Sequence, residues 1–144
     1  MIEWELFNTY FDSKYARQPT SRLLIATTGR TGSHFLAYHL FLTGVLGAPF
    51  EYLHPKHFER WRQLAGGGND PEVLSYIQGK RTNTSGWFSL KAHWNQLYEF
   101  ERRLSKPHTQ MLDFNFAVHL KRKSVISIGR IKGLLRLNFL TDPA

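Results

Sequence analysis

The feature that most constrains the fold is an apolar run that ends in a glycine-containing loop. Residues 23–27 read Leu-Leu-Ile-Ala-Thr, a short run typical of a strand buried in a parallel sheet. The loop 27–33 follows, and residues 34–43 are rich in aromatic residues and leucines that are compatible with a helix. Gly44 stands where a left-handed residue would end that helix. The segment therefore predicts a strand, a tight loop and a helix.

The remainder of the chain alternates between helical and strand patterns. Further helices are predicted over 56–64, 72–78 and 93–104, and further strands over 87–91 and 114–120. Asp70 and Pro71 are expected as the N-cap and the first-turn proline of the second of these helices. The alternation indicates an α/β fold with a mostly parallel sheet flanked by helices, whose ligands lie at the carboxyl ends of the strands.

Length and composition fit one globular domain over residues 1–144. The apolar share of 42% and the charged share of 21% are typical of a chain that builds a core. Residues 1–5 are acidic where a signal peptide would be basic, and no apolar run approaches the roughly 20 residues of a membrane span. Because cysteine is absent, disulfides, thiolate catalysis and Cys-ligated zinc are excluded. We expect a cytoplasmic protein without a membrane span.

The chain is strongly basic, with 19 Lys and Arg against 11 Asp and Glu. A net charge of +8 favours anionic partners, such as nucleotides, sulfated or phosphorylated ligands, nucleic acid or anionic membranes. Nucleic acid is the least favoured of these, because the positive charges follow no recognised reader motif.

The loop after the first strand has the chemistry of an anion site. A strand that leads through a glycine-rich loop into a helix directs backbone N–H groups and the positive end of the helix dipole at one spot. The predicted nucleotide-binding residues are Thr28, Gly29, Arg30, Thr31, Gly32, Ser33 and His34. The loop lacks the Gly-Lys-Ser/Thr ending of a Walker A sequence, which argues against ATP or GTP hydrolysis. The alternative is a plain strand-to-helix connection with Ser33 as N-cap.

This loop resembles the 5′-phosphosulfate loop of sulfotransferases, most closely the bacterial trehalose 2-sulfotransferase type, where an arginine occurs in place of the common lysine. Residues 51–55, 86–94 and 118–123 resemble, in the same order, that family's Glu-Tyr-Phe segment, its second core strand and the strand end that holds the 3′-phosphate of the donor. The resemblance implies a P-loop-like fold of the sulfotransferase type. It also implies transfer of a sulfuryl group from 3′-phosphoadenosine 5′-phosphosulfate to a carbohydrate hydroxyl, on trehalose or a related glycan or glycolipid, without a metal.

Two catalytic roles follow from the resemblance and from the chemistry of in-line transfer. Negative charge builds on the leaving phosphate oxygen, and Arg30 with the N–H groups of residues 31–33 is suited to neutralise it. Glu51 matches the acidic residue that the trehalose enzymes are thought to use as a base, and His54 and His93 are rival bases. The alternatives for Glu51 are a solvated loop carboxylate and a helix-capping partner.

The remaining predicted site residues lie around substrate and donor. The substrate-binding set is Glu51, His54, Lys91, His93 and Trp94. Lys91 could reach a substrate or a phosphate from its strand end, or be a surface lysine. Trp61, Trp87 and Trp94 offer stacking faces, although the helical spacing of Trp61 favours the core. Arg122 and Lys123 are expected to bind the 3′-phosphate.

The resemblance ends at Ser127, so residues 128–144 form a divergent tail and residues 1–20 an N-terminal extension. Relatives carry a serine after the phosphate-binding arginine, where this chain reads Ile128-Gly129-Arg130-Ile131. Either the chain is a truncated or frameshifted product that lacks the C-terminal part of the fold, which we favour, or it rebuilds the phosphate site from Arg130 and Lys132. A sheet without its later layers would favour a homodimer. The alternatives to an enzyme are an inactive nucleotide- or phosphate-binding domain and a basic nucleic-acid-binding module.

Overall fold

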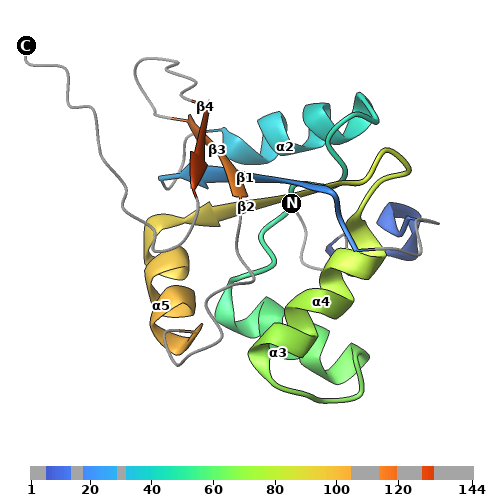
Figure 1. Cartoon of the computed structure of the whole chain (residues 1–144), viewed down its shortest axis with the longest axis vertical. Helices are drawn as coiled ribbons and strands as arrows, with labels where there is room; N and C mark the ends of the chain where they lie inside the picture. The colour runs from blue at the N-terminus through green and yellow to red at the C-terminus, as the bar shows by residue number, and fades with distance from the viewer. Residues whose placement is uncertain (1–5, 14–17, 29–31, 105–113, 120–127, 132–144) are drawn as a thin grey trace, which may run out of the picture.

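The structure, a computed structural model, describes residues 6–13, 18–28, 32–104, 114–119 and 128–131. Its centre is a four-stranded sheet in the order β2-β1-β3-β4 (Figure 1). The strands are β1 (Ser21–Thr27), β2 (Trp87–His93), β3 (Phe114–His119) and β4 (Ile128–Ile131). The first three are parallel and β4 runs antiparallel to β3. A mixed α/β fold with a mostly parallel sheet is therefore confirmed.

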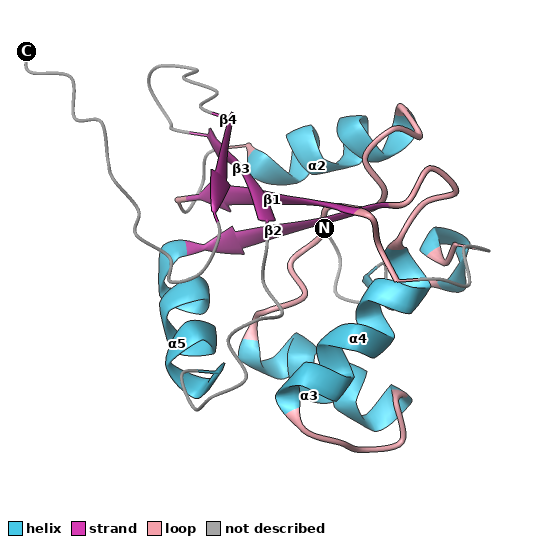
Figure 2. Ribbon diagram, viewed as in Figure 1, coloured by secondary structure: helices cyan, strands magenta, loops and turns pink. Residues whose placement is uncertain are grey.

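Helices lie on both faces of the sheet (Figure 2). They are α2 (Ser33–Leu42) on one face and α3 (Pro55–Leu64), α4 (Asp70–Arg81) and α5 (Trp94–Leu104) on the other, with a short 3-10 turn η1 (Thr9–Phe11) near the N-terminus. Gly44, with φ +69°, follows α2 as the left-handed residue that the sequence predicts. No helix in the described part of the chain is both long and apolar enough to cross a membrane.

The predicted bounds of α4 and β2 are wrong, and α4 spans Asp70–Arg81 rather than 72–78. The N-cap of α4 is Asn69, whose side chain accepts from the Glu72 N–H while the Glu72 carboxylate accepts from the Asn69 N–H. Asp70 is instead the first residue of the helix, because its carboxylate pairs with arginines of neighbouring helices. β2 extends to His93 rather than ending at Lys91, because its pairing with β1 continues for two more residues.

The core lies between the sheet and the helices α3, α4 and α5. Its members on these elements are all less than 6% exposed: Phe58, Trp61, Val73, Leu74, Ile77, Phe88, Leu90, Leu97 and Phe100. Trp61, 2% exposed, is a core residue, as its helical spacing indicates. Trp87 is the first residue of β2 and so lies at the opposite end of the strand from its carboxyl end, where ligands were expected. Neither Trp61 nor Trp87 therefore offers a stacking surface at the carboxyl ends of the strands.

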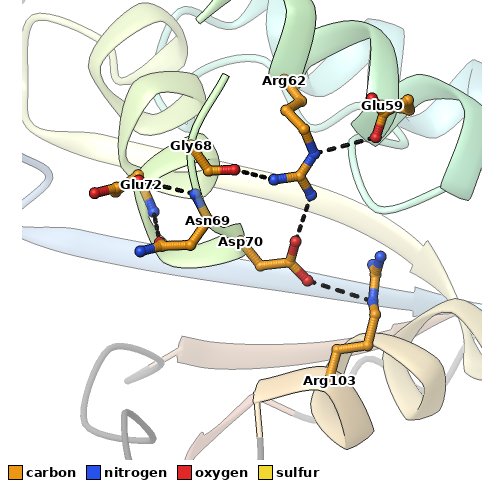
Figure 3. Close-up of polar contacts among 7 residues, drawn as sticks. All are labelled: Glu59, Arg62, Gly68, Asn69, Asp70, Glu72 and Arg103. Atoms are coloured by element: carbon orange, nitrogen blue, oxygen red, sulfur yellow. Dashed lines mark hydrogen bonds and ion pairs between the residues drawn. The ribbon is translucent and has the colours of Figure 1, made fainter. Parts of the chain in front are cut away.

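The three helices below the sheet are joined by one carboxylate (Figure 3). Asp70 at the start of α4 pairs with Arg62 of α3 and, at 3.4 Å, with Arg103 of α5. Arg62 also contacts Glu59 at 3.1 Å and donates to the Gly68 carbonyl. The side chain of Asp70 is 17% exposed, so both pairs are partly shielded from water. This network holds the ends of α3, α4 and α5 together.

Replacing this carboxylate should destabilise the fold. We expect Asp70→Asn to lower the free energy of unfolding by about 1–2 kcal/mol, because two partly shielded guanidinium groups lose their charged partner. Urea unfolding followed by tryptophan fluorescence measures it. Glu99→Gln is the matched control, since its pair with Arg102 is exposed and should contribute less than about 0.5 kcal/mol. Equal effects of the two substitutions would contradict the role of Asp70.

Candidate functional site

The parallel register brings three strand ends into one row. Thr27, the last residue of β1, pairs with His93 of β2 on one side and with His119 of β3 on the other. Ligands of open α/β sheets bind at this edge. His93 is one of the predicted site residues, whereas His119 was given no role, because the strand that it ends was predicted to continue to residue 120.

Glu51 is carried to the same edge by a short stretch that runs alongside β2. Phe50 forms an isolated parallel bridge with Leu90, and its carbonyl accepts from the Lys91 N–H at 3.0 Å. These contacts fix the backbone of residue 51 beside Lys91. The two segments are 40 positions apart in the sequence, so only the fold makes them neighbours.

The start of α2 lies at the same edge of the sheet, in contact with Lys91. Gly32 is the N-cap, with φ +76°, and no side chain caps the helix. Ser33 is the first helical residue and is buried, so the alternative in which Ser33 is a side-chain N-cap is wrong. The first turn of α2 holds no acidic residue, so no carboxylate of the turn itself occupies its N–H groups. Of the other predicted loop residues, Thr28 is exposed, and Gly29, Arg30 and Thr31 lie outside the described residues.

Lys91 is the centre of the cluster. Its side chain is fully buried, and its Nζ lies 3.0 Å from Oε1 of Glu51. The same ammonium lies 3.0 Å from Nδ1 of His34 and 3.4 Å from Oγ of Ser33. The alternative of a surface lysine is therefore wrong. Lys91 connects the start of α2 to the carboxylate beside β2.

Glu51 has a second partner at the strand end. Nε2 of His93 lies 2.9 Å from Oε1, the same oxygen that Lys91 contacts. The Glu51 side chain is 12% exposed, and that of His93 is 28% exposed. The alternative of a solvated loop carboxylate is therefore wrong. Glu51 is instead a buried carboxylate held between an ammonium and an imidazole.

The charges of this cluster shift one another's pKa values. Burial alone would raise the pKa of Glu51, but the Lys91 ammonium and then the two histidines bring it below its ordinary value. Burial lowers the pKa of Lys91, and Glu51 opposes that shift. Burial and Lys91 lower the pKa of His34, which favours the neutral ring that can accept from the ammonium. Opposite charges thus keep the Glu51 carboxylate ionised despite its burial.

Two other predicted substrate residues lie near this centre but do not form it. The ring of His54 packs on that of His57, with 4.6 Å between centroids, and Nδ1 of His57 lies 3.0 Å from the Glu51 carbonyl. Trp94 begins α5 directly after His93 and is 46% exposed. Tyr98, 56% exposed and one helical turn further, shares its face. Tyr98 was not among the predicted site residues, although its four-residue spacing from Trp94 is visible in the sequence.

Arg122 and Lys123, the residues expected to bind the 3′-phosphate of the donor, lie outside the described residues. In the described part of the chain, no three His, Asp or Glu side chains are grouped as a metal site requires. Comparison of the chain with protein-family models, with curated proteins and with solved structures found no match. The chemistry of the site therefore rests on its residues, which offer a helix start without an acidic residue of its own, next to a carboxylate that contacts both an ammonium and an imidazole.

Removing the charge of Lys91 alone should destabilise the fold far more than removing the charges of Lys91 and Glu51 together. We expect Lys91→Met, which keeps the volume, to lower the free energy of unfolding by about 2–3 kcal/mol because it strands a buried carboxylate. Adding Glu51→Gln should recover most of that loss. Urea unfolding at neutral pH of both single variants and the double variant measures the coupling.

The same variants test the sign of the pKa shift of Glu51. Because its folded-state pKa lies below the ordinary 4.5, its stabilising contribution is complete above that pH and is lost as the pH falls through the folded value. The wild type should therefore lose more stability on acidification than Glu51→Gln does. Identical acid sensitivity would show that the carboxylate is not stabilised by its neighbours.

Proposed function

We propose that this chain is a sulfotransferase that moves a sulfuryl group from 3′-phosphoadenosine 5′-phosphosulfate to a hydroxyl of a carbohydrate, trehalose or a related glycan or glycolipid. The carrying observation is the contact of Lys91 with both Glu51 and the start of α2. That contact supports the proposal, because the start of α2 and the Glu51 carboxylate lie against one ammonium. The donor and the family come from the sequence resemblance of the loop and of the segments after it. In this proposal the sheet is of the P-loop-like sulfotransferase type.

The donor side is the loop 27–33 with the first turn of α2. The 5′-phosphosulfate would accept from the N–H groups of this turn, which faces no acidic side chain of its own. Arg30 would neutralise the charge that develops on the leaving phosphate oxygen. At the other end of the donor, Arg122 and Lys123 follow β3 closely and would bind the 3′-phosphate.

The acceptor side is the pair of Glu51 and His93, with Trp94 beside it. In-line transfer requires that the attacking hydroxyl lose its proton, and the carboxylate and imidazole lie at the strand end where a hydroxyl could reach them. The exposed face of Trp94 offers an apolar surface to a sugar ring. No metal takes part in this proposal.

Donor binding is the first test. We expect wild type to bind 3′-phosphoadenosine 5′-phosphate in calorimetry, and Arg30→Ala to weaken the affinity about 10- to 100-fold through loss of a charge-assisted contact. Arg60→Ala is the matched control, because Arg60 is exposed on α3 and its replacement removes the same charge. Unchanged binding by Arg30→Ala would remove the loop from the donor site.

The same titration separates the alternatives. Binding of ATP equal to that of 3′-phosphoadenosine 5′-phosphate would indicate a general nucleotide-binding domain. Tighter, steeply salt-dependent binding of single-stranded DNA would indicate a nucleic-acid-binding module. Donor binding without transfer to any sugar would leave an inactive nucleotide-binding domain.

The acceptor side is tested by sulfuryl transfer to trehalose and related sugars. We expect Trp94→Ala to raise the KM for the sugar about tenfold with a smaller change in kcat, because a stacking surface contributes to binding more than to chemistry. Tyr10→Ala, which removes an exposed aromatic ring from η1, is the control. A lower kcat with an unchanged KM in Trp94→Ala would contradict this role.

A homodimer and a cytoplasmic location are further parts of the proposal. Support for the homodimer comes from α2, where Phe35, Tyr38 and Leu42 are each at least 50% exposed. Exposed apolar patches of this kind are characteristic of interaction surfaces.

A further inference from the structure

The geometry points to His93 as the group that takes the acceptor's proton, with Glu51 as the residue that positions it. This inference rests on the proposed function and refines the role that the sequence resemblance gives to Glu51. The two residues touch, so the question is which of them is free to act on an incoming hydroxyl. The contacts and the exposure of the two side chains give the same answer.

One carboxylate oxygen of Glu51 already has two partners. This oxygen, Oε1, lies within 3.0 Å of both Lys91 and His93, and the side chain is 12% exposed. A carboxylate that neutralises a buried ammonium is a weak base, because taking a proton would leave that ammonium without its counter-charge. The lowered pKa of Glu51 agrees with this.

His93 has one ring nitrogen engaged and one available. Nε2 faces Glu51 at 2.9 Å, and no side chain that the structure describes forms a hydrogen bond or an ion pair with Nδ1. The ring is the more exposed member of the pair, at 28%. The backbone N–H of His93 donates to Oε1 of Gln96, which fixes the turn from β2 into α5. A carboxylate that orients an imidazole while the other nitrogen receives a proton is the arrangement of hydrolase triads.

Among the side chains that the structure describes, the charged and titratable groups around the imidazole come from three segments. Glu51 comes from the stretch beside β2, Lys91 from β2 itself and His34 from α2. The side chain of Lys91 is fully buried and its Nζ lies 3.0 Å from Oε1 of Glu51, so its charge keeps the carboxylate ionised and able to stabilise an imidazolium. His34 contacts the same ammonium from α2.

The transfer step balances with these groups. The acceptor oxygen forms a bond to sulfur, and the bond between sulfur and the bridging phosphate oxygen breaks. The electron pair leaves with that oxygen on 3′-phosphoadenosine 5′-phosphate. The hydroxyl proton moves to Nδ1 of His93, and the imidazolium that forms is stabilised by Glu51 until water takes the proton.

The first experiment needs no turnover. Nitrogen-15 NMR of the histidine rings in the wild-type protein should show that neutral His93 carries its proton on Nε2, and Glu51→Gln should weaken that preference. Neutral His93 with its proton on Nδ1 would overturn the inference, because that nitrogen could not accept another proton.

The second experiment is kinetic and uses the wild-type chain with two variants. We expect His93→Ala to lower kcat about 10²- to 10⁴-fold, the usual contribution of a general base, with little change in donor affinity. Added imidazole should restore part of this loss. Glu51→Gln should keep an acid limb in its pH–rate profile and gain nothing from imidazole. Loss of the limb in Glu51→Gln, together with an active His93→Ala, would return the base to Glu51.

The two experiments separate failure of the inference from failure of the proposed function. If the wild type transfers no sulfuryl group but NMR finds the Nε2-protonated ring, the pair stands and the sulfotransferase proposal fails. If transfer occurs and the ring carries its proton on Nδ1, the sulfotransferase proposal stands and the assignment of His93 fails. His39→Ala, on the exposed side of α2, is the control for removal of a histidine.

Discussion

The ammonium of Lys91 lies in the interior with a side chain that water does not reach, and much of the site follows from its need for partners. A buried charge is tolerated when an opposite charge and hydrogen-bond acceptors surround it. Glu51 supplies the charge, and Ser33 and His34 at the start of α2 supply the acceptors. The stretch beside β2 and the start of α2 must therefore both reach β2, which places the two halves of the site against each other.

The two sides of the site at the strand edge therefore present different chemical groups. Toward α2 the site presents N–H groups with no acidic side chain among them, an environment for an anion. Toward α5 it presents His93, whose ring is more accessible than the carboxylate that holds it. In the proposed reaction, proton uptake and anion binding would need opposite electrostatic surroundings, and the shared ion pair of Lys91 and Glu51 would allow both within one cluster. The network around Asp70 supports α3, α4 and α5 beneath the sheet, away from this edge.

Much of the fold could be predicted because apolar periodicity is a local property. β1, α2, α3 and α5 lie within one or two residues of their expected positions. The N-cap of α4 was predicted one residue late, since Asn69 and Asp70 are both suitable caps and only the arginines of α3 and α5 decide between them. The antiparallel strand β4 was not predicted, because its pairing with β3 is a long-range interaction that four residues do not reveal.

The sequence by itself determined the kinds of residue available near the strand edge: a glycine-containing loop, the glutamate at position 51 and a strand predicted to end at Lys91, two residues before His93. Local pattern left Lys91 equally suited to a substrate or phosphate contact and to the surface, and left a solvated loop open for Glu51. Only the tertiary structure decided these cases, because the parallel bridge between residue 50 and β2 joins segments that are distant in the chain. Burial then forced the ammonium and the carboxylate to pair, and the pair left His93 as the accessible group. Charge neutralisation in the interior is a property of the packed chain, so no local pattern contains it.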